Sequence, residues 1–192
     1  MSRTSAIEQF LKRLARCPPY KLAATLVRRV PWVALGGRRR PDFLFTSGRP
    51  NRYNLAETAC LYLCDNDTTA QGEYEDGVDP LVNPAQPVVV FRAKMSLVRR
   101  PAVDLLDAET RRVLGLTPAD LFADWRQAKP IATQWLGEAV ARARTFSAIR
   151  YPSRAAQQRQ RTGFNVVVFR DCVAAPDAVE IVGPKGALQR WP

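Results

Sequence analysis

The spacing of apolar and polar residues along the chain predicts several separate helices and strands. Residues 5–16 carry apolar residues at the spacing of one helical face, and Ser5 three positions before Glu8 predicts a capping box at its start. Pro18 and Pro19 are expected to end this helix. We expect it to dock on the rest of the domain through its apolar face, which consists of Ile7, Phe10, Leu11 and Leu14.

Short apolar segments have the composition of strands. Within residues 59–64, alternation places Cys60, Tyr62 and Cys64 on the face opposite to the two leucines. The other expected strands cover residues 87–93, 164–169 and 178–182.

Helical spacing fills the intervals between these strands. Asp67 is expected to cap a helix over residues 68–75. Thr117 followed by Pro118 is the sequence of a helix start, and Pro130 separates two helices. Separate strands and helices in 192 residues predict one α+β domain and not an alternating parallel fold. The remaining expected elements are a short helix within residues 103–116, helices over 118–127 and 131–144, and a loop over 36–54.

The net charge of +11 indicates an anionic partner. Nucleic acid, an acidic protein and a phosphate-bearing substrate all satisfy this charge, and any single arginine cluster is also consistent with a solvated face. We find no run of apolar residues long enough to span a membrane and no secretory signal, so we expect a cytoplasmic protein.

The absence of histidine excludes several kinds of chemistry. Catalytic groups built on a Ser-His or Cys-His pair need that residue, and so do zinc sites with histidine ligands. A zinc site of cysteines alone would have to combine Cys60 and Cys64 with the distant Cys17 and Cys172, without a paired CxxC, and is less favoured. No P-loop or dinucleotide fingerprint is present, and we expect no metal and no bound cofactor. The cysteines are expected to be free and mostly buried. They are Cys17, Cys60, Cys64 and Cys172.

Two groups of residues are candidates for chemistry. Arg52, Tyr62 and Glu73 lie on an expected loop, strand and helix that can converge at one end of the strand. An arginine fork grips phosphate, a tyrosine stacks on a ring, and a carboxylate stabilises a ribosyl cation. Ser153 and Asn165 can hydrogen-bond a substrate. From the residues alone, a surface arginine, a core tyrosine, a solvated glutamate and ordinary turn residues are the favoured interpretation.

Several short motifs, taken in order, match a known pattern. Together, over about residues 45–170, they resemble the RES domain of bacterial toxin–antitoxin pairs, a family named for its Arg, Glu and Ser. The matching segments are Arg52-Tyr53-Asn54, Ala59 to Leu63, Ala70 with Glu73, Leu105-Leu106-Asp107, Asp124 to Gly137, Ile149 to Ser153, and Asn165.

This resemblance implies a fold like that of ADP-ribosyltransferase toxins, with mixed sheets around an NAD+ cleft and flanking helices. Residues 41–175 would form the catalytic core, residues 1–40 an N-terminal helix and extension, and residues 176–192 a C-terminal strand packed on the core. The toxin would break the nicotinamide–ribose bond of NAD+ and pass ADP-ribose to phosphate or water. Its partner would be an antitoxin with a DNA-binding helix-turn-helix region.

Residue by residue, the resemblance gives Arg52, Tyr62, Glu73 and Ser153 catalytic roles. It gives substrate-binding roles to Arg49, Tyr53, Asn54 and Asn165. Arg49 is a rival for the key arginine in a shifted register, and Glu75 is the second choice for the carboxylate.

Two other functions stay open. The same fold serves enzymes that transfer ADP-ribose to a protein target. A basic module without catalysis would instead bind nucleic acid with steep salt dependence. This last reading is less favoured, because no aromatic residues are interleaved with the arginine clusters as a platform for stacked bases.

Overall fold

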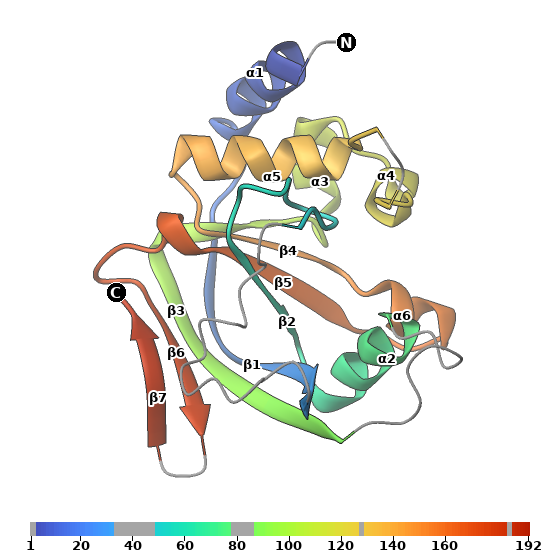
Figure 1. Ribbon diagram of the computed structural model, residues 1–192. Helices are drawn as coiled ribbons and strands as arrows, with labels where there is room; N and C mark the ends of the chain where they lie inside the picture. Colours follow the sequence, from blue (N-terminus) through green and yellow to red (C-terminus); the bar gives the residue numbers. More distant parts are fainter. Residues whose placement is uncertain (1–2, 33–48, 78–86, 127–128, 184–185) are drawn as a thin grey trace.

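A seven-stranded sheet of mixed strand directions forms the centre of the molecule (Figure 1). The computed structural model describes residues 3–32, 49–77, 87–126, 129–183 and 186–192. The strands are β1 (Tyr20–Pro31), β2 (Cys60–Cys64), β3 (Val88–Asp104), β4 (Ala148–Pro152), β5 (Phe164–Phe169), β6 (Ala178–Gly183) and β7 (Gly186–Trp191).

Five of the strands close on themselves. The sheet has the order β1-β2-β5-β4-β3-β6-β7, and an additional pairing of β1 with β3 completes a ring. The pairing of β3 with β4 is parallel, and the other pairings are antiparallel. β6 and β7 continue from β3 as a hairpin outside the ring, at the lower left of Figure 1.

Alternation along the strands supplies apolar side chains to the two faces of the ring. Leu61 and Leu63 belong to one buried cluster, while Cys60 and Tyr62 pack with the other, as the sequence predicts. The first cluster also contains Leu22, Leu26 and Val30 of β1, Ala93, Met95 and Leu97 of β3, and Val166 and Val168 of β5.

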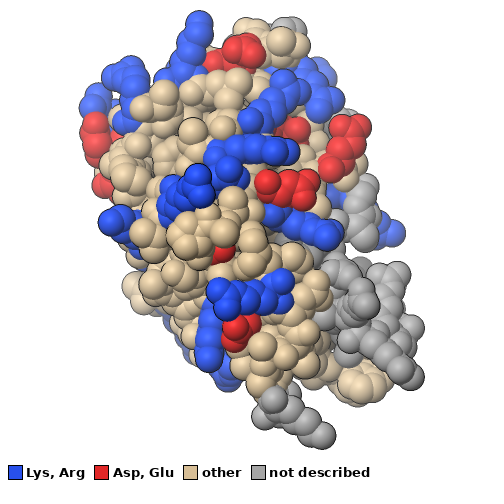
Figure 2. Space-filling model, turned by 90° about the vertical axis from the view of Figure 1, so that its left-hand side faces the viewer, with Lys and Arg blue, Asp and Glu red and all other residues tan. Residues whose placement is uncertain are grey.

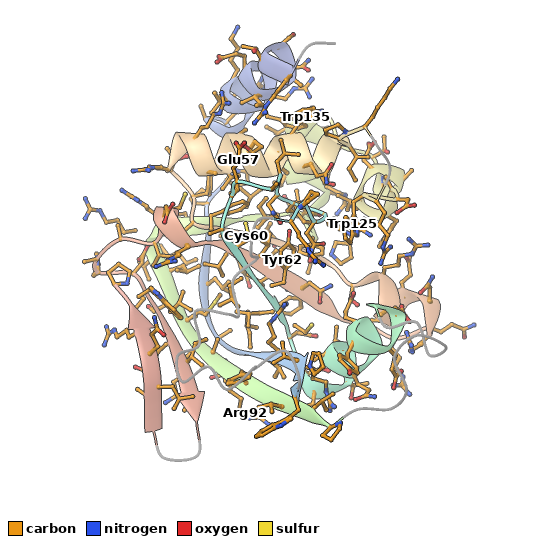
Figure 3. All side chains as sticks on the ribbon, in the orientation of Figure 1. Glu57, Cys60, Tyr62, Arg92, Trp125 and Trp135 are labelled. Atoms are coloured by element: carbon orange, nitrogen blue, oxygen red, sulfur yellow. The ribbon has the colours of Figure 1, made fainter. Side chains whose placement is uncertain are left out.

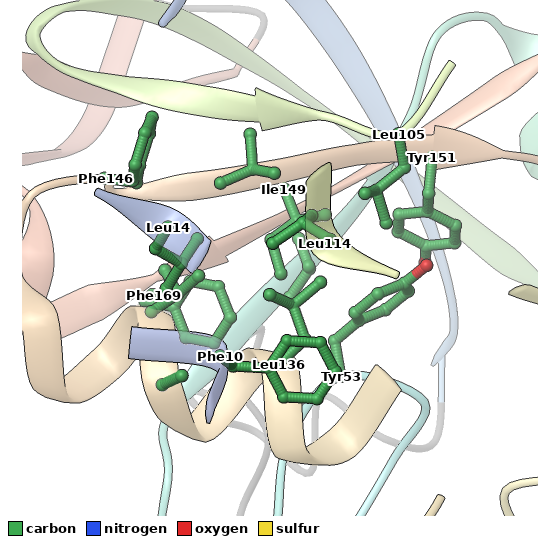
Figure 4. Close-up of a cluster of buried hydrophobic side chains, with 14 of the residues drawn as sticks. Phe10, Leu14, Tyr53, Leu105, Leu114, Leu136, Phe146, Ile149, Tyr151 and Phe169 are labelled. Atoms are coloured by element: carbon green, nitrogen blue, oxygen red, sulfur yellow. The ribbon is translucent and has the colours of Figure 1, made fainter. Parts of the chain in front are cut away.

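Helices cover the other face and build the second apolar cluster. In Figure 1, α1, α3, α4 and α5 lie above the sheet, and α2 and α6 lie together at its right-hand end. Figure 4 shows Phe10, Phe169 and Tyr53 among the side chains of this cluster, between α5 and the sheet. The helices are α1 (Arg3–Leu14), α2 (Asp67–Gly77), α3 (Ala108–Leu114), α4 (Pro118–Phe122), α5 (Ala132–Ala143), α6 (Arg154–Gln158) and the short 3-10 helix η3 (Arg170–Cys172).

β3 is much longer than the expected strand over residues 87–93, because it changes partners along its length. It pairs with β1 and β6 first and with β4 at its end. Between these regions the backbone N–H groups of Val98, Arg99 and Arg100 donate to the buried carboxylate of Asp177, at 2.8, 2.8 and 2.6 Å. The Asp177 carboxylate thus accepts the hydrogen bonds that a neighbouring strand would otherwise accept just before Pro101, and β3 continues beyond this point.

Several sequence predictions are confirmed: the helices of α1, α2, α3 and α5, the strands β2, β5 and β6, and free cysteines. Thr117 caps α4, with Asp120 completing the capping box. Two predicted caps are wrong. Ser5 lies inside α1, which already includes Arg3, and Asn66, not Asp67, accepts the Thr69 N–H at the start of α2.

Other elements were shorter than expected or not expected at all. α4 ends at Phe122, well before the predicted residue 127, while β1, β4, β7 and α6 had no sequence prediction. Most of the expected loop over 36–54 lies outside the described residues. No helix in the described part of the chain has the length and apolar character needed to cross a bilayer.

Candidate active site

A cleft of about 810 Å³ opens where the ends of β1 and β2 meet α2, α6 and the segment after α4. Five arginines and two carboxylates line it among the described residues, so its walls are strongly basic. Figure 3 shows Tyr62 on the sheet and Trp125 between α4 and the sheet, two aromatic residues of this lining. The charged residues are Arg28, Arg29, Arg52, Arg126, Arg154, Glu73 and Asp76.

Glu73 is held in place through one of its two oxygens. Its Oε1 accepts a hydrogen bond from Ser153 Oγ at 2.6 Å and another from Asn165 Nδ2 at 2.7 Å. Ser153 is itself buried and fixed, because it caps α6 by accepting the Ala156 N–H at 3.1 Å. The second oxygen, Oε2, receives no hydrogen bond from the described residues and remains available to the cleft.

This arrangement brings together three residues that the sequence placed in two separate groups. α2 supplies Glu73, the β4–α6 junction supplies Ser153, and β5 supplies Asn165. Ser153 lies behind Glu73 and is not part of the cleft lining, whereas Glu73 and Asn165 are. Ser153 therefore acts on the carboxylate rather than on a molecule in the cleft.

The hydroxyl of Tyr62 organises the turn that carries Arg52. It accepts the Tyr53 N–H at 3.0 Å and donates to Asn54 Oδ1 at 2.8 Å. Burial raises the pKa of Tyr62 well above its ordinary value, so the hydroxyl keeps its proton. Asn51 and Asn54 close the turn by backbone hydrogen bonds at 2.9 and 3.3 Å.

Arg52 lines the cleft from this turn, and its guanidinium is anchored. Its Nη1 donates to the carbonyl oxygens of Leu121 and Ala123, at 2.8 and 3.0 Å. Among the described residues, no acceptor binds the other N–H groups of this guanidinium, so they can donate to an anion in the cleft. Arg52 therefore joins the β2 side of the cleft to the end of α4.

Three residues of α5 form a platform under the same turn. Gln134 Nε2 donates to the Asn51 carbonyl at 2.9 Å. The buried Glu138 accepts from Thr58 Oγ1 at 2.6 Å and from the Leu55 N–H at 3.3 Å. Between them, Gly137 lies so close that a Cβ there would stand 1.7 Å from the Tyr53 carbonyl oxygen.

The other sequence candidates lie outside the cleft lining. The side chain of Arg49 is exposed, and only its carbonyl takes part in the turn by accepting from Asn54 Nδ2 at 3.1 Å. Tyr53 and Asn54 are fully buried, and the Tyr53 ring packs on Tyr151 with centroids 4.4 Å apart. Glu75 is exposed and pairs with Arg159 at 3.2 Å. The structure thus places Arg52 and Glu73, not Arg49 and Glu75, at the cleft.

Sequence reasoning missed Arg28 and Cys64 as cleft residues. Arg28 was one member of an arginine pair, and its place on a strand could not be recognised because β1 was not predicted. Its Nη1 donates to the Tyr62 carbonyl at 2.9 Å, and burial lowers its pKa. Burial also raises the pKa of Cys64 to about 12; Glu73 raises it further and Arg28 opposes this.

These groups can stabilise a cation beside a bound anion. A carboxylate oriented by two donors favours positive charge at one point, while the surrounding arginines favour phosphate groups. Among the described residues, no group of three or more cysteine or acidic side chains is arranged to hold a metal ion. The cleft brings together a fixed carboxylate, tyrosines and guanidinium groups.

Comparison with known proteins places this chain in a family. No curated protein sequence matches it. It is similar in structure to a chain in the crystal structure of the M. tuberculosis MbcT–MbcA toxin–antitoxin complex, with a TM-score of 0.64 and 15% sequence identity, over 95% of this chain and 91% of that one. The model of the RES domain matches residues 25–190. The chain therefore belongs to the RES-domain family.

Proposed function

We propose that this protein cleaves the bond between nicotinamide and ribose in NAD+. The observation that carries the proposal is the carboxylate of Glu73, held by Ser153 and Asn165 at the edge of an arginine-lined cleft. Membership of the RES-domain family supports it, since the motifs that resemble that family supply these same residues.

The reaction needs little beyond positioning and charge. Nicotinamide leaves as a neutral ring, because the electron pair of the breaking C–N bond cancels the charge of the pyridinium nitrogen. Positive charge then develops on the ribose, and a carboxylate fixed beside it lowers the energy of that state. Glu73 Oε2 is the oxygen available for this role, since both donors bind Oε1.

The remaining residues of the cleft suit the rest of the dinucleotide. Arg52 and the arginines near the mouth, Arg126 and Arg154, supply donors for the two phosphates of NAD+. Trp125 and Tyr151 offer aromatic surface for flat rings. ADP-ribose would pass to phosphate or to water, and no bound cofactor or metal takes part.

We further propose that the activity is that of a toxin controlled by an antitoxin. MbcT–MbcA is a toxin–antitoxin complex, and this chain shares its fold over most of its length. An antitoxin with a DNA-binding helix-turn-helix region would bind over the cleft and hold the enzyme inactive. The toxin would act in the cytoplasm, where depletion of NAD+ arrests growth.

The basic surface does not by itself demand a nucleic-acid function. Lysine and arginine side chains are spread over the face in Figure 2, with acidic side chains among them. The five arginines of the cleft give part of the positive charge a place in the proposed reaction.

NAD+ consumption by the purified protein tests the proposal, with products identified by mass. Glu73→Gln keeps an oxygen that can accept from Ser153 and Asn165 but removes the negative charge. We expect it to lose on the order of 100-fold or more in rate. Glu75→Gln is the matched control, because Glu75 is an exposed residue of the same helix outside the cleft.

Loss of NAD+ by both variants at the wild-type rate would refute a role for Glu73. No loss by the wild type would contradict NAD+ cleavage by the protein alone. Labelled NAD+ in a cell lysate would then separate transfer to a protein target from salt-sensitive nucleic-acid binding without catalysis.

A further inference from the structure

Several arginines lie together where α5 ends, on the side of the molecule away from the cleft. α5 ends on the left of Figure 1, whereas α2 and α6, which line the cleft, lie on the right. Figure 2 shows this left-hand side, on which lysine and arginine side chains predominate over acidic ones. We call the cluster the arginine junction; it consists of Arg99, Arg100, Arg144 and Arg170.

Contacts between β3, the end of α5 and η3 hold these arginines near one another. Arg99 Nη1 donates to a carbonyl oxygen of the segment after η3 at 2.8 Å, and Arg100 Nη1 donates to the Cys172 carbonyl at 3.0 Å. Burial raises the pKa of the Cys172 thiol to about 11, and the charges of Arg144 and Arg100 oppose this rise, so both lie near that thiol. Arg170 is the first residue of η3, which ends at Cys172.

The described carboxylates do not offset the charge of this cluster. Arginines elsewhere in the described part of the chain form ion pairs, but Arg99, Arg100 and Arg144 take part in none of them. Asp171 is exposed beside Arg170, and Asp177 is buried with its oxygens accepting three backbone N–H groups. The arginine junction therefore carries an excess of positive charge.

Arg144 occupies a backbone position that favours glycine. It caps α5 with φ 52° and ψ 19°, and its N–H donates to the Val140 carbonyl at 3.1 Å. Glycine is the usual residue at a left-handed cap, because a Cβ is unfavourable in this conformation. An arginine there lowers stability relative to glycine, which is expected where the side chain has a function outside the fold.

The composition of this surface suits the phosphate backbone of a nucleic-acid duplex. A duplex presents phosphates at regular intervals, and arginine forks bind them without contacting the bases. A protein partner would need an apolar or aromatic centre, and a single strand would need rings on which its bases stack. Among the large exposed apolar residues of the described chain, Val98 is the one adjacent to the arginine junction.

We propose that the arginine junction binds the phosphate backbone of duplex DNA, without reading its sequence. The proposed antitoxin carries a DNA-binding region that would keep the toxin beside DNA, so the choice of DNA over RNA rests on the proposed function. Because the junction and the cleft lie on different sides of the molecule, DNA does not occupy the cleft. Toxin and antitoxin would then both contribute to the affinity of their complex for DNA.

Fluorescence anisotropy of a labelled DNA duplex tests this with the protein alone, at salt concentrations from about 50 to 200 mM. The test variant combines Arg99→Gln with Arg144→Gly and so removes two charges of the junction. Each lost phosphate contact lowers the slope of log K against log salt by about 0.9, so we expect a slope shallower by about 1.8 and binding at least about tenfold weaker at low salt.

Two control variants remove the same charge elsewhere. Arg92→Gln with Arg112→Gln changes two exposed, ion-paired arginines outside the junction. Arg126→Gln with Arg154→Gln changes two arginines of the cleft. Both controls should bind within about threefold of the wild type, because charges outside the contact act only through a field that salt screens.

Arg144→Gly alone keeps the test decisive if the double variant does not fold. Glycine suits the left-handed cap, so this protein should be at least as stable as the wild type while its slope falls by about 0.9. A stable Arg144→Gly protein with the wild-type slope would overturn the inference.

Three other results would also overturn it. The first is no binding of duplex DNA by the wild type at low salt. The second is equal weakening by the test variant and either control, since net charge or the cleft would then hold the DNA. The third is tighter binding of single-stranded DNA or duplex RNA than of duplex DNA. A lack of NAD+ cleavage contradicts only the proposed function, because DNA binding is measured without NAD+.

Discussion

Replacing Gly137 by alanine should lower both the activity and the stability of the protein. The new Cβ would stand 1.7 Å from the carbonyl oxygen and 2.6 Å from the carbonyl carbon of Tyr53, where real Cβ atoms stay beyond 3.0 Å. Both obstructing atoms belong to the backbone and cannot rotate away. The turn that carries Arg52 must therefore withdraw from α5 by about 1.3 Å or more.

The magnitude of each effect can be worked out from this displacement. A misplacement of about 1 Å in a group that positions substrate costs on the order of 100-fold in rate, or about 2.7 kcal/mol of barrier. Overpacking costs about 1–3 kcal/mol of folding free energy, and the better helix propensity of alanine returns about 1 kcal/mol. The withdrawing turn also weakens its hydrogen bonds to Gln134 and Glu138, so the net loss of stability should be about 2–5 kcal/mol, which leaves a domain of average stability folded at 25 °C.

Initial rates of NAD+ loss and urea unfolding of the same preparations would check this. Arg142→Ala is the control, because it changes an exposed position of the same helix without approaching the turn. A folded Gly137→Ala protein with wild-type kcat/KM would refute the reasoning, since it would mean that the position of the turn does not govern the site.

Three further changes test the supports of the site. Tyr62→Phe leaves the Tyr53 N–H without its acceptor, so the free energy of unfolding measured with urea should fall by about 1–3 kcal/mol. An unchanged urea midpoint would show that the hydroxyl does not stabilise the turn. Glu138→Ala removes a buried acceptor of two hydrogen bonds and should lower the free energy of unfolding by about 2–5 kcal/mol in the same assay. A variant as stable as the wild type would contradict this. Burial raises the pKa of Cys17 and of Cys172 from 9.0 to about 11, so the unfolded chain loses these protons first. The associated stabilisation is complete below pH 9 and is lost as the pH rises toward 11, and urea midpoints at pH 8 and 10.5 should show a decline that Cys172→Ala makes shallower.

The elements best predicted from the sequence are those whose stability is local. α1 and α5 show one apolar face each, and β2 alternates between two buried clusters, so neighbouring residues carry the signal. The cap of α4 was predicted equally well, because Thr117 is followed directly by Pro118. Such patterns need no knowledge of what lies far away in the chain.

The elements that were missed depend on distant partners. β3 continues past Pro101 because Asp177, more than 70 residues later, accepts the N–H groups that a strand would otherwise have used. β1 has arginines inside an apolar strand, and only the cleft beside it explains Arg28. Neither the hydrogen bonds to Asp177 nor the cleft beside Arg28 can be recognised from the spacing of apolar residues within a segment.

The candidate site divides in the same way. Motif order identified Arg52, Tyr62, Glu73, Ser153 and Asn165, but not what they do to one another. The structure shows that Ser153 donates a hydrogen bond to the Glu73 carboxylate and that the Tyr62 hydroxyl accepts one from the backbone of the turn. Those relations arise from packing between segments, and the functional roles assigned to the residues stay predictions.

The closed ring of strands also bears on when this protein becomes active during its own synthesis. β2 lies between β1 and β5, so the middle of the ring stays open until β5 has been made. β5 is also the strand that brings Asn165 to Glu73, and Ser153 lies just after β4, the preceding strand. A nascent chain that stops short of Phe164 thus has its carboxylate but neither a complete sheet nor the full clamp around it. The site would therefore assemble only after translation has passed β5.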